Sequence, residues 1–311
     1  MKKIIAIIAT LGLTAAVAAA QDFNAAVDLF NAGAQALEAG NKADAVTQFK
    51  LALPQFEACE EDEASAKVDE CKRLITNILL SISKDQLKES SFDEALVTLA
   101  QVKETAAGFG QEEAIAEATD LIPKVYMAKA QSFMKAKDFA AAIPNLNEYL
   151  AINPEDGQAY LLLGQSIMQT GDLDGASVAL DKAAEFGKAE QANKLNANIF
   201  LKKGQALLKG GKNAEAVEAL TKSNTYVESA NAYKLMASAL TKSGKTKDAI
   251  EAYKKYLEVD PNAKDKSDIL FTIAATAQKA GDKATAIEYY NQLTGDAKYK
   301  DQAAAQLKTL K

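Results

Sequence analysis

Residues 157–190 read GQAYLLLGQSIMQTGDLDGASVALDKAAEFGKAE, a pattern of two short amphipathic helices separated by a turn. Gly171 is placed to end the first helix, and Asp172 to cap the second. Gly164 lies inside the first helical pattern, where a glycine costs roughly 1 kcal/mol relative to alanine. We therefore expect another helix to approach the backbone closely at Gly164.

The same unit recurs along the chain. A small residue marks each copy, follows a turn, and precedes a large apolar side chain by four positions; these residues are Ala45, Ala95, Ala142, Ala176, Ala216, Ala249 and Ala286. A period near 34 residues is typical of helix pairs that cannot bury their apolar faces alone and must stack on their neighbours. The sequence therefore predicts about seven stacked helix pairs.

This pattern resembles the tetratricopeptide repeat. The fourth unit matches the family's places 4, 7, 8, 15, 20, 24 and 27 with Tyr160, Leu163, Gly164, Gly171, Ala176, Leu180 and Ala183. The second unit departs most, because Ser83 and Ser90 stand where glycine is usual. The resemblance implies an all-α fold, a right-handed α-solenoid of about seven such helix-turn-helix repeats with a C-terminal capping helix.

The resemblance also divides the chain. We expect a signal peptide at 1–20, a repeat array over 21–295 and a capping helix at 296–311. The units are expected near 26–59, 76–109, 123–156, 157–190, 197–229, 230–263 and 267–295. Residues 111–122 interrupt the period but are helix-like themselves, so we expect them to lengthen the first helix of the third unit.

The first twenty residues have the organisation of an export signal. Lys2 and Lys3 precede an apolar run over residues 4–17, and Ala18 and Ala20 form a small-x-small cleavage site. A retained membrane anchor is the alternative, but the run is short for a membrane span. Cleavage would leave Gln21 first, with no cysteine there to take a lipid. We expect a soluble periplasmic protein without a membrane anchor, and a secreted one as second choice.

Charge limits the classes of partner. Without Lys2 and Lys3 the mature chain has 34 basic and 42 acidic residues, a formal charge of −8. Nucleic acid is a poor partner for such a chain. Arg73 is the single arginine, so an anionic partner must be recognised mainly by lysine.

Two cysteines, Cys59 and Cys71, form an even count in a chain expected to be exported, which predicts a disulfide between them. Acidic residues 60–63 would form the tip of the enclosed hairpin, centred near Ser65. The alternative is two buried thiols. Without histidine, two cysteines do not predict a closed zinc site, and we expect no metal and no cofactor.

Catalysis is disfavoured by missing residue types. The chain has no histidine, which removes the usual general base, and no tryptophan, which weakens the case for a sugar-cleaving helical enzyme. Asp172 to Gly175 hint at a calcium loop, but Ala183 occupies the place of its closing glutamate. We therefore expect a protein that is not an enzyme.

The family resemblance implies that the first helix of each pair lines a concave groove, with places 2, 5, 9, 12 and 13 directed inward. In the third to seventh units the candidate partner-binding residues at these places are Met127, Gln131, Met134, Lys135, Leu161, Gln165, Met168, Leu201, Gln205, Lys209, Lys242 and Lys279. Such a groove suits an extended or helical peptide of acidic character. The alternative is that the lysines serve solubility alone.

These observations predict a scaffold that binds a protein or peptide partner in the periplasm and helps to assemble or organise the cell envelope. Two alternatives stay open. The groove could bind cell-wall glycan, although the lack of tryptophan weighs against it, or the chain could assemble with itself through its end helices.

Overall fold

The structure is a computed structural model that describes residues 23–310. The expected signal peptide at 1–20 lies outside the described residues. Every regular element within 23–310 is helical. No helix in this range is long and apolar enough to cross a membrane.

Fourteen of the helices follow one another as seven pairs, and one more helix closes the described chain. In chain order they are α1 (Phe23–Glu38) and α2 (Lys42–Glu57), α3 (Asp62–Lys88) and α4 (Phe92–Phe109), α5 (Glu112–Lys135) and α6 (Phe139–Ile152), α7 (Gly157–Thr170) and α8 (Leu173–Ala183), α9 (Ala189–Lys209) and α10 (Asn213–Tyr226), α11 (Ala230–Lys242) and α12 (Thr246–Val259), α13 (Lys266–Lys279) and α14 (Lys283–Asn291), then α15 (Lys300–Leu310). We call the odd-numbered member of each pair its first helix. The predicted all-α solenoid of helix-turn-helix repeats is confirmed.

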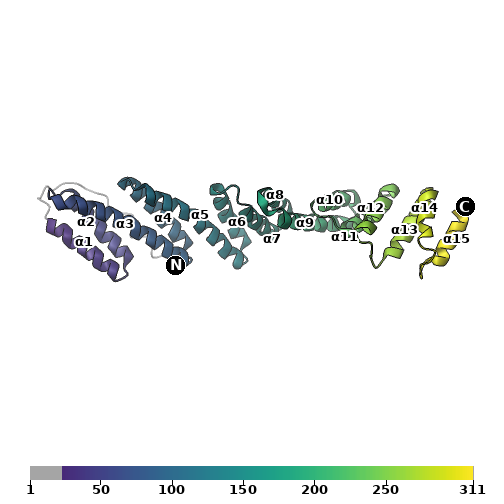
Figure 1. Cartoon of the computed structure of the whole chain (residues 1–311), viewed down its shortest axis with the longest axis horizontal. Coiled ribbons are helices and arrows are strands. Elements are labelled where there is room, and N and C mark those ends of the chain that lie inside the picture. The colour runs from purple at the N-terminus through teal and green to yellow at the C-terminus, as the bar shows by residue number, and fades with distance from the viewer. Residues whose placement is uncertain (1–22, 311) are drawn as a thin grey trace. The chain divides into compact units, whose positions relative to one another are not determined.

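The chain divides into two compact units, Met1–Ser132 and Phe133–Lys311. In the first, α1 to α4 each pack against the next helix, as Figure 1 shows in purple and blue. Phe30 is surrounded edge-to-face by Phe49 and Phe56, with ring centroids 5.2 and 6.3 Å away. These rings lie in one continuous core with Ile75 and Leu99. The N-terminal unit is thus held together by apolar contacts between successive helices.

In the second unit, α6 to α15 also pack each against the next. The recurring glycines have the role that their spacing predicts. A Cβ built on Gly164 would lie 2.7 Å from Leu180 Cγ, and one on Gly204 would lie 2.6 Å from Leu220 Cγ. Both distances are shorter than van der Waals contact, so the second helix of each pair approaches the first where the first has no side chain.

The helix α5 is long, as predicted. It begins at Glu112 and continues through Pro123 to Lys135, so the residues that interrupt the repeat period add about three turns to its N-terminal end. Ala114 and Ala118 in these added turns are buried in the core of the N-terminal unit. The insertion is therefore part of the packed structure.

Between α8 and α9 the chain bends through a kink at Ala184–Lys188, where the backbone angles of Phe186 and Gly187 are not helical. Gly187 has a φ of +86°, a left-handed conformation that a residue with a side chain rarely adopts. The kink brings the backbone oxygen of Phe186 to 2.1 Å from where a Cβ on Gly157 would lie. Glycine at 157 is therefore required by a close backbone contact with this kink.

The predicted disulfide between Cys59 and Cys71 is not formed in the structure. The α2–α3 turn is centred near residue 60 instead of Ser65, because α3 already begins at Asp62. Cys71 is nine residues along α3, about 14 Å from its start, whereas bridged Cα atoms lie within about 7 Å of each other. Cys59 Sγ instead donates to the backbone oxygen of Gln55 at 3.1 Å, and burial raises the pKa of the Cys71 thiol to about 11.

Candidate partner-binding site

The predicted partner-binding residues all lie on first helices of the later pairs, but their exposure differs. Five are exposed: Gln131, Lys135, Lys209, Lys242 and Lys279. Six are half-buried: Met127, Met134, Gln165, Met168, Leu201 and Gln205. The exposed set offers amide and ammonium groups to solvent, and the half-buried set offers partly covered apolar and amide groups beside them.

The placement of Leu161 in the groove is wrong. Its side chain is only 3% exposed and packs in a core with Leu180, Ala192 and Ile199. The cause is α9, which begins at Ala189, eight residues before the expected unit at 197–229. Its added turns bring Ala192 and Leu195 to the cluster that contains Leu161. A partner therefore cannot reach Leu161.

The four predicted lysines share a position. Lys135, Lys209, Lys242 and Lys279 are each the last residue of their helix. The C-terminal end of a helix carries partial negative charge, so a cation there stabilises the helix by about 0.3–1 kcal/mol. This local role explains lysine at these places whether or not a partner binds.

In the C-terminal unit, one of these lysines lines a cavity. The cavity has a volume of about 430 Å³ and lies between the end of α11 and the end of α13. Its lining includes Thr241, Thr246, Thr276 and Lys279. The cavity thus lies beside two successive first helices and the start of the second helix α12, with hydroxyl groups and one ammonium group available for hydrogen bonding.

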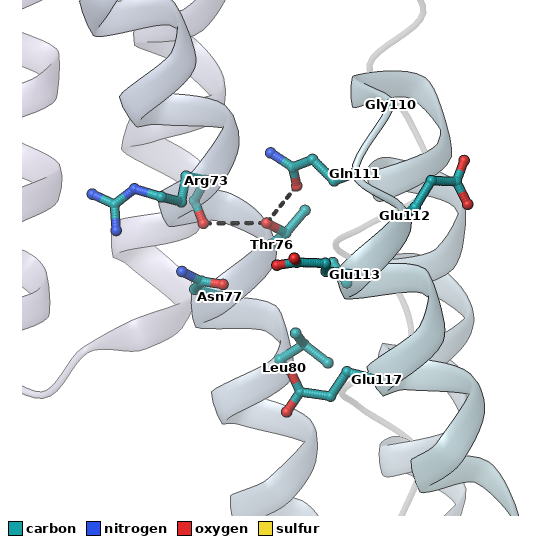
Figure 2. A pocket seen from close by; sticks show the side chains of 10 residues that line it. Arg73, Thr76, Asn77, Leu80, Gly110, Gln111, Glu112, Glu113 and Glu117 are labelled. Carbon is teal, nitrogen blue, oxygen red and sulfur yellow. Dashed lines mark hydrogen bonds between the residues drawn. The ribbon is translucent and has the colours of Figure 1, made fainter.

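In the N-terminal unit, a second cavity of about 440 Å³ lies between α3 and the start of α5, again two successive first helices. Figure 2 shows Thr76, Asn77 and Leu80 on α3 facing Glu113 and Glu117 on α5. Sequence reasoning did not single out this cavity. Asn77 and Leu80 are at places 2 and 5 of the second unit, so the repeat pattern could have predicted the α3 wall of this cavity.

The α5 side of this cavity comes from the insertion. Glu113 and Glu117 belong to the added turns of α5, for which the repeat pattern makes no prediction. Gln111 precedes these turns, and its Oε1 accepts a hydrogen bond from Thr76 at 2.7 Å. Glu117 also forms an ion pair with Lys84 of α3, with N and O 2.6 Å apart. These contacts fix the distance between α3 and α5 across the cavity.

Two family models, both described as tetratricopeptide repeat, match residues 133–195 and 201–265. The chain contains tetratricopeptide repeats in these two segments. Proteins of this family are generally non-catalytic scaffolds for protein interaction, and the groove residues of α7, α9 and α11 lie within the matched segments. No curated protein sequence matches this repeat protein significantly.

The solved structures that resemble this chain include those of MamA, P58(IPK) and PilW. MamA from residue 41 to its end, from Desulfovibrio magneticus RS-1, is 19% identical in sequence to this chain. The similarity covers 58% of this chain and 96% of the MamA chain, with a TM-score of 0.30. The tetratricopeptide-repeat domain of P58(IPK) is 16% identical, with 92% and 97% covered and a TM-score of 0.28. PilW, a widely conserved type IV pilus biogenesis factor, is 18% identical, with 75% and 98% covered and a TM-score of 0.30.

Tyrosine–aspartate hydrogen bonds join successive pairs of this repeat protein. Tyr149 on α6 donates to Asp156 at 2.6 Å, and Asp156 also accepts from two backbone amides at the start of α7. Tyr256 on α12 donates in the same way to Asp265, which precedes α13. Each bond ties the second helix of one pair to the first helix of the next, so it fixes the spacing of the first helices that line the candidate site.

These bonds shift the ionisation of both partners. Burial opposes ionisation of Asp156 and Asp265, but hydrogen bonds, and Lys234 beside Asp265, outweigh it and lower the pKa of both carboxyl groups. The hydrogen bond to Asp156 raises the pKa of Tyr149 to about 12. Burial, with the bond to Asp265, raises the pKa of Tyr256 to about 12.

Stability should therefore fall at both extremes of pH. A lowered carboxyl pKa stabilises the fold above the unfolded value of about 3.9, and this contribution is lost as pH falls through the folded pKa. A raised tyrosine pKa stabilises the fold below about 10, and this contribution is lost as pH rises toward about 12. With no histidine in the chain, we expect a nearly constant thermal midpoint from about pH 5 to pH 9.

The measurement is the thermal midpoint against pH for the native protein and for a variant with Tyr149→Phe and Tyr256→Phe. The variant should be less stable at neutral pH, and its loss of stability between about pH 10 and pH 12 should be smaller. An equal alkaline loss in both proteins would show that these two tyrosines do not carry the effect.

Proposed function

We propose that this protein is a non-enzymatic scaffold in the periplasm that holds a protein or peptide partner against its first helices and helps to organise the cell envelope. One observation carries the proposal: both described cavities lie between successive first helices, the side on which the family resemblance places the groove. The exposed lysines at the ends of α9, α11 and α13, with the half-buried Gln205 amide of α9, suit a partner segment with carboxylate groups.

The location is supported by the sequence of residues 1–20 alone. Fractionation of cells that express the full chain should release the protein with the periplasmic contents. Sequencing of its N-terminus should then give Gln21 as the first residue. Recovery from the cytoplasm with Met1 or Lys2 first would overturn this part of the proposal.

A photo-crosslinking side chain placed at Gln165 or Gln205 should capture a partner in living cells. Both positions lie on first helices and are half-buried. Glu218, exposed on the second helix α10, is the matched control position. We expect discrete heavier adducts from Gln165 and Gln205 and none from Glu218. Adducts of the same size and yield from all three positions, or from none, would overturn the proposed binding face.

A further inference from the structure

The two units of the chain carry different charge. Residues 23–132 contain 10 basic and 19 acidic residues, a formal charge of −9. Residues 133–311 contain 24 basic and 22 acidic residues, a formal charge of +2. The net negative charge of the mature protein therefore comes from the N-terminal unit, whose field attracts cationic partners.

The cavity of that unit concentrates the same sign of charge. Figure 2 shows the Glu113 carboxylate directed into the space between α3 and α5, and the Arg73 guanidinium directed away from it. Glu117 is already paired with Lys84. For Glu113 the described residues provide no ion-pair partner. The Glu113 carboxylate is therefore not neutralised by Arg73, the one arginine in the cavity lining, because the Arg73 guanidinium is directed away from the space.

The walls of the cavity suit the charged end of a cationic side chain. Leu80 lines the α3 wall beside Glu117, as Figure 2 shows, but it is only 3% exposed, so the accessible part of the wall is mainly polar. Asn77 is exposed on the same wall and offers an amide oxygen as a further acceptor.

We propose that the cavity between α3 and α5 binds a lysine or arginine side chain from a basic segment of a partner protein, with Glu113 as its main counter-charge. The inference rests on the proposed function, because it assigns one part of a partner to the same side of the repeats. It also gives the two units opposite preferences: a basic segment at the N-terminal unit and a carboxylate-bearing one at α9 to α13.

The test uses the full mature chain and a fluorescent peptide of about ten residues that alternates lysine with glycine. A peptide that alternates glutamate with glycine is the opposite-charge probe. At low salt, fluorescence anisotropy should show binding of the lysine peptide and none of the glutamate peptide at the same concentration. Binding should weaken as salt is raised, because exposed charges are screened.

The decisive variant is Glu113→Gln. It should raise the Kd for the lysine peptide about threefold, the effect of losing one exposed charge contact. The matched control is Glu94→Gln, an exposed carboxylate on α4 outside the cavity, and makes the same change in net charge. Its Kd should stay within about 1.5-fold of the native value, since long-range charge alone contributes little. Equal circular dichroism spectra establish that both variants are folded.

An equal loss of affinity in the two variants would overturn the inference, because net charge and not the cavity would then explain the binding. No binding of the lysine peptide to the native chain would overturn it as well. So would full displacement of the peptide by spermidine at equal concentration, since the occupant would then be a small cation. Crosslinked adducts at Gln165 and Gln205 together with any of these results would leave the proposed function in place and remove this inference alone.

Discussion

Replacing Gly157 with alanine is expected to destabilise the C-terminal unit by about 3 kcal/mol, at the upper end of the usual cost of overpacking. The new Cβ would lie 2.1 Å from the backbone oxygen of Phe186 and 3.2 Å from that of Ala183. Neither atom belongs to a flexible side chain. Phe186 is further restrained by its ring, which stacks on Tyr160 at 5.7 Å, and by the left-handed Gly187 that follows it.

Urea unfolding followed by circular dichroism measures this loss, and hydrogen exchange of α7 to α10 locates it. Gly108→Ala is the matched control. Gly108 lies in α4 with nothing within 4 Å of the Cβ position, so alanine should stabilise α4 by up to about 1 kcal/mol. Opposite signs for the two substitutions are the expected result. A stabilising effect of Gly157→Ala would show that the kink between α8 and α9 moves readily.

The helix pairs could be predicted from the sequence because each one repeats the same local information. Gly171 ends a helix in the left-handed conformation, and the Asp172 side chain accepts from the Gly175 amide to begin the next. Gly164 and Gly204 lie opposite leucines four residues beyond the repeat alanines. Helix ends and close contacts within a pair depend on residues near in sequence, so one unit read correctly predicts the others.

The errors arise where contacts cross from one pair to the next. Leu161 has the place of a groove residue in its own unit, but the early start of α9 covers it. The two cysteines do not pair in the structure because the turn between α2 and α3 lies about five residues before the expected centre at Ser65. Insertions change which helix faces which, and a repeat pattern carries no information about them.

The same limit applies to the candidate site. Lys279 could be placed beside the α11–α13 cavity because its place in the repeat is regular. Glu113 could not be placed beside α3, because its position depends on how the added turns of α5 dock on the N-terminal core. Binding residues supplied by an insertion have to be found from tertiary structure.

Leu180→Ala is expected to destabilise the protein by about 3 kcal/mol, within the range of roughly 2–5 kcal/mol for truncating a fully buried leucine. Leu180 has no exposed surface, and its branched end occupies the space left open by Gly164. Gly164→Ala alone should cost about 1–2 kcal/mol, because the clash with Leu180 Cγ exceeds the gain in helix propensity. Urea unfolding of each single variant provides both values.

The double variant Gly164→Ala with Leu180→Ala distinguishes the contact between residues 164 and 180 from a general loss of buried apolar surface. Once Leu180 is shortened, the new methyl group at 164 enters free space and the helix gains propensity, so Gly164→Ala should become neutral or stabilising. The two changes should therefore couple by at least about 1 kcal/mol. The control pair is Gly164→Ala with Leu220→Ala, since Leu220 packs against Gly204 instead, and its effects should add within about 0.5 kcal/mol. Additive effects in both pairs would mean that the glycine at this place is not required by the leucine of the facing helix.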